Sequence, residues 1–492
     1  MKRLSSETQA LLPAAVARPS YDRAQLKAGI VHLGTGAFHR AHQAVYVERV
    51  VAKFGGDWGI IGSSLRSRGV ADQMNPQDGL YTVVVRDTDQ ESMALIGCVK
   101  EVIFAPEQPQ LLIDVIANRD IKILTLTITE KGYCHDPASG NLLLSHPGVQ
   151  QDLADLTAPV TALGYMCAGL KARFEQGNGA ITLLSCDNLP NNGKVLKKVL
   201  LQFAQQVDAT LADWIAKNVS FPCSMIDRIV PATTDADKAR IEAVLGLRDE
   251  AMVVTEPFTQ WVVEDNFAAG RPAFEAVGVQ MVADVTAYEE IKLRFLNGAH
   301  SMLAYSGYMA GFDFIYQVMQ SAPLVAALER FWRTEVEPTV EAPDAMNLGD
   351  YQRQLSARFA NAALAHKTYQ IAMDGSQKIP QRWLNTLRAQ LASGGSITLL
   401  SFGLANWIRY VGGVNEQGAA ITVQDPMAAV LRDVHQQHGS SHSDLVAAIL
   451  RLEDIFGADL AANTRLSSAL VGWLDQLQRL GTLEALRQAL AK

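Results

Sequence analysis

The chain carries a lysine, an asparagine and a histidine close together, at Lys292, Asn297 and His300. Because a regular α-helix turns about 100° per residue, the three fall on one side of a helix, with Leu296 between them. A lysine in partly apolar surroundings loses hydration and its pKa falls, so Lys292 could act as a general base. The same pattern also fits a surface lysine, a capping asparagine and a satisfied core histidine, and the residues alone leave both interpretations open.

Polar residues follow several apolar segments that have the character of buried strands. Residues 129–133, 185–188 and 227–228 each stand directly after such a segment. Ligands bind beyond the carboxyl ends of the strands in open α/β sheets, so these residues together predict a site at one sheet edge. Asn188, with Asn297, could donate hydrogen bonds to a developing alkoxide. Each segment by itself is equally compatible with an ordinary loop.

A glycine-rich turn follows the first apolar run, residues 29–33. Gly34 would permit the tight turn and Gly36 would let the backbone approach a pyrophosphate, although His39 stands where a third glycine is usual. The turn therefore predicts a dinucleotide-binding loop with a partial motif. The candidate cofactor-binding residues are Gly34, Gly36, Ala37, Phe38, Arg40 and, after the second strand, Arg66.

The end of the second predicted strand carries no acidic residue that could bind the ribose hydroxyls of NAD. Arg66 and Arg68 follow it instead, which leaves NADP open beside NAD. His39 and His42 have HxxH spacing, but no third ligand stands nearby, and a helix start with capping and phosphate-facing donors explains them better. We therefore expect no metal.

Composition limits the class of protein. Hydrophobic residues make up 48% and charged residues 19% of the 492 residues. These fractions are typical of a globular chain. The net charge of −8 disfavours nucleic acid and anionic membranes as partners. The five scattered cysteines form no CxxC pair and the first residues lack an apolar signal segment, so we expect a reducing, cytoplasmic location. HExxH, GxSxG and Walker motifs are missing from the sequence.

The elements that must position these residues divide into two parts. In residues 1–285, short Val- and Ile-rich runs alternate with helical segments, which predicts an α/β Rossmann-type domain with a parallel sheet. In residues 286–492, helical periodicity dominates and predicts a mostly α-helical domain. The expected strands are residues 29–33, 58–61, 121–128, 180–184, 251–254 and 279–285.

These segments resemble the long-chain polyol (mannitol) dehydrogenase family over nearly the whole chain. The resemblance rests on the 34–42 loop, on residues 129–133, 185–188, 227–231 and 256–265, and on the Lys292, Asn297 and His300 set. It implies a Rossmann-type domain and a helical domain with the site between them, and an NAD-dependent, metal-independent dehydrogenase.

The resemblance also implies residue roles. Lys292 would be the general base, Asn188 and Asn297 the alkoxide-stabilising pair, His300 a substrate-positioning group and Asp227 a residue that tunes the lysine. Residues 366–382 resemble the members that reduce D-fructuronate to D-mannonate, since mannitol dehydrogenases tend to have arginine at Gln370. The expected substrate contacts are Lys378, Gln370 and Glu130.

Other functions stay open at this point. A neutral polyol such as mannitol or arabinitol, or tagaturonate, is an alternative substrate. A nucleotide-binding regulator without turnover is disfavoured, because a sensor needs no general base. We expect a small-molecule sugar acid or polyol as the only partner of a monomer or small homo-oligomer.

Overall fold

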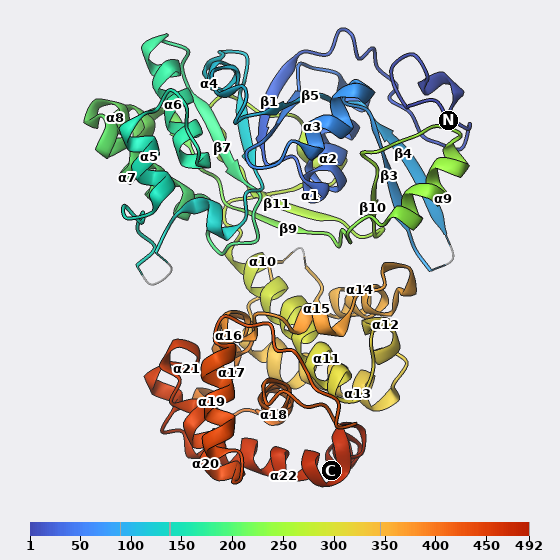
Figure 1. Ribbon diagram of the computed structural model, residues 1–492, viewed down its shortest axis with the longest axis vertical. Helices are drawn as coiled ribbons and strands as arrows, with labels where there is room; N and C mark the ends of the chain where they lie inside the picture. Colours follow the sequence, from blue (N-terminus) through green and yellow to red (C-terminus); the bar gives the residue numbers. More distant parts are fainter. Residues whose placement is uncertain (89, 137–138, 345, 492) are drawn as a thin grey trace. The chain divides into compact units, whose positions relative to one another are not determined.

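The computed structural model describes residues 1–88, 90–136, 139–344 and 346–491. Its contacts divide the chain into two compact units, Met1–Thr286 and Ala287–Lys492. The first unit is built on β-sheets and the second on helices, as the colours from blue to green and from yellow to red show (Figure 1). The predicted fold class is confirmed in both units.

The first unit contains a six-stranded parallel sheet in the order β5-β2-β1-β6-β7-β8. The chain moves outward from β1 to β2 on one side and then continues with β6 on the other side of β1. The strand order therefore reverses between β1 and β6, where ligands bind in such sheets. The strands are β1 (Ala28–Leu33), β2 (Gly59–Ser64), β5 (Val99–Phe104), β6 (Ile123–Leu126), β7 (Ile181–Ser185) and β8 (Val219–Ser220).

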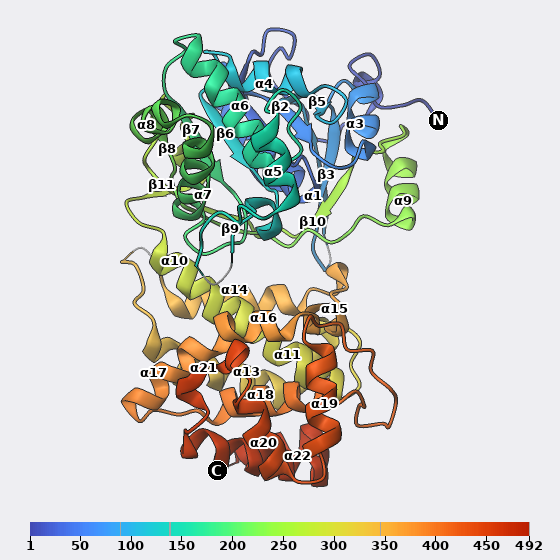
Figure 2. The ribbon, with the colours of Figure 1, turned by 60° about the vertical axis from the view of Figure 1, so that its left-hand side comes forward.

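Both faces of this sheet are buried, which explains why its strands are continuously apolar. Val31 of β1 belongs to a core with α4 and α6, whereas the preceding Ile30 belongs to a core with α2. Figure 2 shows α5, α6 and α7 in front of β6 and β7. The helices are α1 (Ala37–Ala41), α2 (Gln43–Phe54), α3 (Gly69–Met74), α4 (Pro109–Ala117), α5 (Pro147–Ala154), α6 (Ala162–Glu175), α7 (Asn192–Val207), α8 (Ala209–Asn218) and α9 (Asp235–Leu245).

Two small sheets complete the first unit and correct part of the sequence prediction. One has the order β10-β3-β4 and the other β12-β11-β9. Residues 251–254 and 279–285 were expected in the parallel sheet, but β10 and β12 lie in these small sheets, and the β3–β4 hairpin was missed. The strands are β3 (Tyr81–Arg86), β4 (Glu91–Ile96), β9 (Ser224–Asp227), β10 (Val253–Thr255), β11 (Gln260–Glu264) and β12 (Gln280–Val282).

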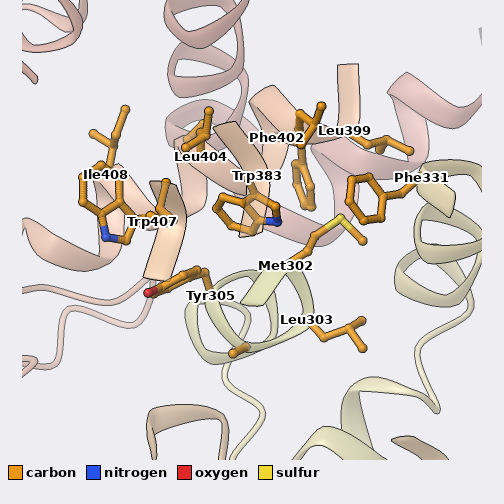
Figure 3. Close-up of a cluster of buried hydrophobic side chains, with 14 of the residues drawn as sticks. Met302, Leu303, Tyr305, Phe331, Trp383, Leu399, Phe402, Leu404, Trp407 and Ile408 are labelled. Atoms are coloured by element: carbon orange, nitrogen blue, oxygen red, sulfur yellow. The ribbon is translucent and has the colours of Figure 1, made fainter. Parts of the chain in front are cut away.

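The second unit is helical around one aromatic-rich core. Figure 3 shows Met302 and Tyr305 of α11 beside Trp383 and Trp407, and the Tyr305 and Trp383 ring centroids are 6.0 Å apart. No helix of the described residues has the length and apolar character to cross a membrane. The helices are α10 (Thr286–Ile291), α11 (Gly298–Met309), α12 (Ile315–Val318), α13 (Ala322–Phe331), α14 (Leu348–Ala360), α15 (Thr368–Ala372), α16 (Gly375–Ile379), α17 (Asn385–Ser393), α18 (Thr398–Val411), α19 (Ala428–His438), α20 (His442–Leu450), α21 (Glu453–Leu460) and α22 (Thr464–Leu490).

Candidate active site

The first unit has a pocket at the reversal point of its parallel sheet. Its volume is about 450 Å³, and its walls come from the loops after β1, β2 and β6 and from the start of α6. This volume is in the usual range of small-molecule sites. Gly34 has φ of 92°, and a Cβ there would lie 2.2 Å from the Thr127 carbonyl oxygen, so this turn requires glycine. At Gly36 a Cβ would meet little, which leaves room beside the backbone, and the pocket therefore suits a dinucleotide.

Arg40, which the sequence predicts as a phosphate ligand, points into the fold. Its side chain is buried, and the guanidinium donates to the carbonyl oxygens of Ala251 and, at 3.3 Å, Gly36. Tyr81 in turn donates to the Arg40 carbonyl oxygen at 2.8 Å. The short helix α1 thus directs Arg40 toward β10 and into the fold. Gly34, Gly36 and Arg66 line the pocket, whereas Ala37, Phe38 and Arg40 are not among the described residues that do.

The histidines near this loop stack and form hydrogen bonds within the fold. The rings of His32 and His39 stack with centroids 3.5 Å apart, and His32 shares hydrogen bonds with the Thr125 and Thr127 hydroxyls. Burial lowers the pKa of His32 to about 3 and lowers that of His39 as well. His42 bonds to the Gln260 carbonyl oxygen at 2.8 Å. Within the described residues, no group of three or more His, Cys, Asp or Glu side chains is arranged to hold a metal ion.

The two arginines after β2 differ in their surroundings. Arg66 lines the pocket. Arg68 pairs instead with Asp72, at 2.9 Å, and with Glu107. The described residues that line the pocket include no Asp or Glu. The wall therefore lacks the carboxylate that commonly holds the ribose hydroxyls of NAD.

Asp187 organises the polar residues that follow β6 and β7. Its buried carboxylate accepts hydrogen bonds from the amides of Ile128 and Thr129 and from the Tyr133 hydroxyl. Burial raises the pKa of Asp187, and these hydrogen bonds oppose the rise. Glu130 lies exposed in a 3₁₀ turn directly after Thr129. Sequence reasoning placed Asp187 among the polar residues at a strand end but gave it no role of its own.

The sequence suggested that Asp227 ends a strand of the parallel sheet, but it does not. It ends β9, which pairs antiparallel with β11 in a small sheet. The start of β9 is nevertheless tied to the end of β7, because Ser224 donates to the Ser185 carbonyl oxygen at 2.6 Å. Asn192 joins the same region by donating to the carbonyl oxygens of Asp187 and Ser224. Asn188 and Asp227 thus belong to neighbouring strand ends of different sheets.

In the second unit, the segment that carries Lys292 is not a regular α-helix. Residues 292–297 form a π-helix between α10 and α11, so the spacing of a regular helix does not apply between Lys292 and Asn297. Side chains bond to carbonyl oxygens along this turn: Trp332 donates to Phe295 and Trp383 to Gly298, each at 2.9 Å. Such π-helical turns occur often at functional sites. The Lys292 side chain is buried.

His300 lies among basic groups. Its ring stacks on those of Phe359 and His366, at centroid distances of 5.2 and 5.5 Å. Its Nε2 atom is buried and has no hydrogen-bond partner among the described residues. Burial is the largest cause of the lowered His300 pKa, and four basic side chains add to it: His366, Arg382, Arg358 and Lys378. Of these four, sequence reasoning had proposed only Lys378 as a substrate contact.

Lys378 is held at the end of α16. Its ammonium donates to the carbonyl oxygens of Met373, at 2.6 Å, and Ile371, at 3.3 Å. Burial, followed by the charge of Arg382, lowers the Lys378 pKa to about 8. Gln370 lies exposed on α15. Arg382 donates to the Ser301 hydroxyl at 2.9 Å and to the Asn297 carbonyl oxygen, which links the π-helical turn to this basic group.

Comparison with known proteins assigns each of the two units to a known domain family. Residues 28–276 match the mannitol dehydrogenase Rossmann domain, and residues 284–478 match the mannitol dehydrogenase C-terminal domain. The chain belongs to the mannitol dehydrogenase family. This confirms the resemblance that the sequence motifs indicated, and places the chain among NAD-dependent oxidoreductases that act on CH–OH groups.

Individual relatives cover nearly the whole chain. An oxidoreductase of Escherichia coli K12 named YeiQ is 45% identical over 97% of this chain and 98% of its own length. The D-mannonate oxidoreductase of the same organism is 43% identical over 95% of this chain and 97% of its own length. The structure of Pseudomonas fluorescens mannitol 2-dehydrogenase with NAD and D-mannitol matches with a TM-score of 0.88 and 37% identity, covering 100% of both chains. All three are oxidoreductases, and the two whose names give a substrate differ in it: D-mannonate in one and D-mannitol in the other.

Proposed function

We propose that this protein is an NAD-dependent fructuronate reductase, which reversibly reduces D-fructuronate to D-mannonate. The observation that carries the choice of an anionic substrate is the group of basic side chains around His300. The cationic groups of Arg358, Arg382 and Lys378, which also penalise a proton on His300, would stabilise a carboxylate placed near them. The relationship to a D-mannonate oxidoreductase supports the same choice.

The proposal assigns residues of both units. Lys292 is the general acid and base, and Asn188 and Asn297 donate hydrogen bonds to the reacting oxygen. His300, Lys378, Gln370 and Glu130 contact the substrate, and Asp227 tunes the lysine. Gly34, Gly36 and Arg66 bind the dinucleotide. The proposal also includes a cytoplasmic location and a monomer or small homo-oligomer.

The chemistry then divides between cofactor and protein. NADH supplies the hydride that reduces the substrate ketone. Lys292, in its ammonium form, donates a proton to the oxygen as that oxygen becomes an alcohol. The two asparagine amides hold the oxygen while negative charge develops on it, which lowers the barrier because these donors are already oriented. In the oxidation direction, neutral Lys292 accepts the hydroxyl proton.

A substrate panel tests the proposal. The initial rates of NADH oxidation should be measured with fructuronate, tagaturonate and fructose, and those of NAD⁺ reduction with mannonate, mannitol and arabinitol. We expect the highest kcat/KM among the ketones with fructuronate. A higher kcat/KM with fructose would instead support a mannitol 2-dehydrogenase, which the similarity to that enzyme's structure makes the second candidate.

A further inference from the structure

Thr129 adopts a backbone conformation that side chains strongly disfavour. Its φ is 65° and its ψ is 162°. This region of backbone conformation is populated essentially by glycine, and for a β-branched residue a positive φ is a clear outlier. Thr129 stands at the first turn after β6 and lines the pocket of the first unit. Strain of this kind persists only when the surrounding structure holds it.

The groups that hold Thr129 come from the neighbouring strand end and from its own loop. Asp187 follows β7, and its Oδ1 atom accepts the Thr129 amide at 2.8 Å. The other carboxylate oxygen accepts the Ile128 amide at 3.2 Å and the Tyr133 hydroxyl at 2.9 Å. One buried carboxylate thus receives three donors from residues 128–133. Asp187 is held in turn, because Asn192 donates to its carbonyl oxygen.

We infer that Asp187 is a positioning residue for the cofactor pocket. Its carboxylate holds Thr129 in the strained conformation and thereby fixes the wall formed by residues 127–134, which faces Gly34 and Gly36 in the lining of the same pocket. Asn188, the proposed hydrogen-bond donor, is the next residue along the chain. The Asp187 side chain therefore fixes both this wall and the start of the segment that carries Asn188. The inference rests on the proposed function only for the use of NAD(H).

The substitution Asp187→Asn tests this role, since it keeps the size of the side chain. An amide presents one acceptor oxygen and one donor group where three donors converge, so it cannot hold both backbone amides and Tyr133. We expect the Kd of NADH, measured by fluorescence titration, to rise by about 10- to 100-fold, as is typical when a hydrogen bond to a charged group is lost. The melting temperature should be recorded on the same samples.

A second substitution distinguishes positioning from a general structural role. Glycine adopts the Thr129 conformation without strain, whereas alanine retains the Cβ atom that opposes it. Thr129→Gly should therefore restore NADH affinity in the Asp187→Asn background, and Thr129→Ala, its matched control, should not. If Asp187 served stability alone, the melting temperature would fall while the Kd of NADH stayed near the wild-type value, and the substitutions at Thr129 would have no loss of affinity to restore.

Two results would overturn the inference. One is an unchanged Kd for NADH in Asp187→Asn, and the other is equal NADH affinity of the two double variants, in which Thr129→Gly or Thr129→Ala is combined with Asp187→Asn. If Asp187→Asn fails to fold, Tyr133→Phe, which removes one of the three donors, takes its place in the same comparison. The measurement uses no sugar substrate, so its outcome is independent of whether fructuronate is the substrate.

Discussion

The imidazole rings of His300 and His366 stack in the helical unit, with centroids 5.5 Å apart and planes inclined at 29°. Burial lowers the pKa of both rings, and that of His366 to about 4. Both rings are therefore neutral near pH 7. Because both rings are neutral, they do not repel each other, and each can donate a hydrogen bond to a substrate hydroxyl or accept one from it.

This pair predicts acid sensitivity of the helical unit. A histidine whose pKa is lower in the folded state binds a proton more readily when unfolded, so stability is lost as pH falls from about 6.5 toward 4. His366 should contribute a loss of about 1.4 kcal/mol per pH unit across that range. Denaturant unfolding of the wild type and of His366→Asn at several pH values measures the difference. An equally steep pH dependence in the variant would contradict the prediction.

The success of the fold prediction has a physical basis in residues such as Val31 and Ile30. Strands buried on both faces are continuously apolar, and this signal located β1, β2, β6 and β7. The β3–β4 hairpin and the small sheets were missed or misplaced, because short apolar runs do not reveal their pairing partner. The sheet to which β10 or β12 belongs is decided by contacts far apart in sequence.

Sequence reasoning could name candidate site residues, but it could not give their geometry. Strand ends and the Lys292, Asn297 and His300 spacing indicated the candidates. The π-helical turn at residues 292–297 could not be seen, because it is stabilised by donors distant in sequence such as Trp332. The burial of Arg40 could not be seen for a similar reason: its partner, the Ala251 carbonyl oxygen, lies 211 residues away along the chain.

Removing the Lys292 amine should abolish acid–base catalysis. We expect Lys292→Ala to lower kcat by about 10²- to 10⁴-fold. The oxidation rate of the wild type should rise with pH as Lys292 loses its proton, and this rise should disappear in the variant. NADH affinity should stay near the wild-type value, and added primary amines should restore part of the rate. Arg294→Ala, which alters the same π-helical turn, is the matched control. A near-normal kcat in Lys292→Ala would transfer the role of base to His300.

The charge of Lys378 should set an upper pH limit for binding an anionic substrate. Its pKa is about 8, so its ammonium charge is lost as pH rises through that value. The KM for fructuronate should therefore rise above pH 8, while the KM for neutral fructose should change less. Lys378→Arg, which keeps its charge at these pH values, should remove the inflection. The same inflection in the variant would exclude Lys378 as its origin.

Activity should survive removal of metal ions. The proposed base is an amine, and the described histidines form hydrogen bonds and stacks rather than a ligand cluster. Dialysis against EDTA, followed by assay in metal-free buffer, should leave kcat unchanged. If zinc were needed to restore activity, His39, His42 or His300 would have to be reconsidered as ligands.

The choice between NADH and NADPH tests the wall of the cofactor pocket. Family membership favours NADH. The part of the pocket lining that the structure describes has no carboxylate, and arginines follow β2, so these residues do not oppose a 2′-phosphate. We expect a higher kcat/KM with NADH. The guanidinium of Arg68 already pairs with the carboxylates of Asp72 and Glu107, so Arg68 is less available to bind a phosphate.

Two variants locate the origin of any NADPH activity. Arg66→Ala and Arg68→Ala should be assayed with both reduced cofactors, and their Kd values for NADPH measured by fluorescence. If either arginine binds the 2′-phosphate, its removal should weaken NADPH binding and leave NADH binding nearly unchanged, because only NADPH carries that group. A tenfold preference of the wild type for NADPH would overturn the assignment of NADH, and the variant that loses this preference would identify the phosphate ligand.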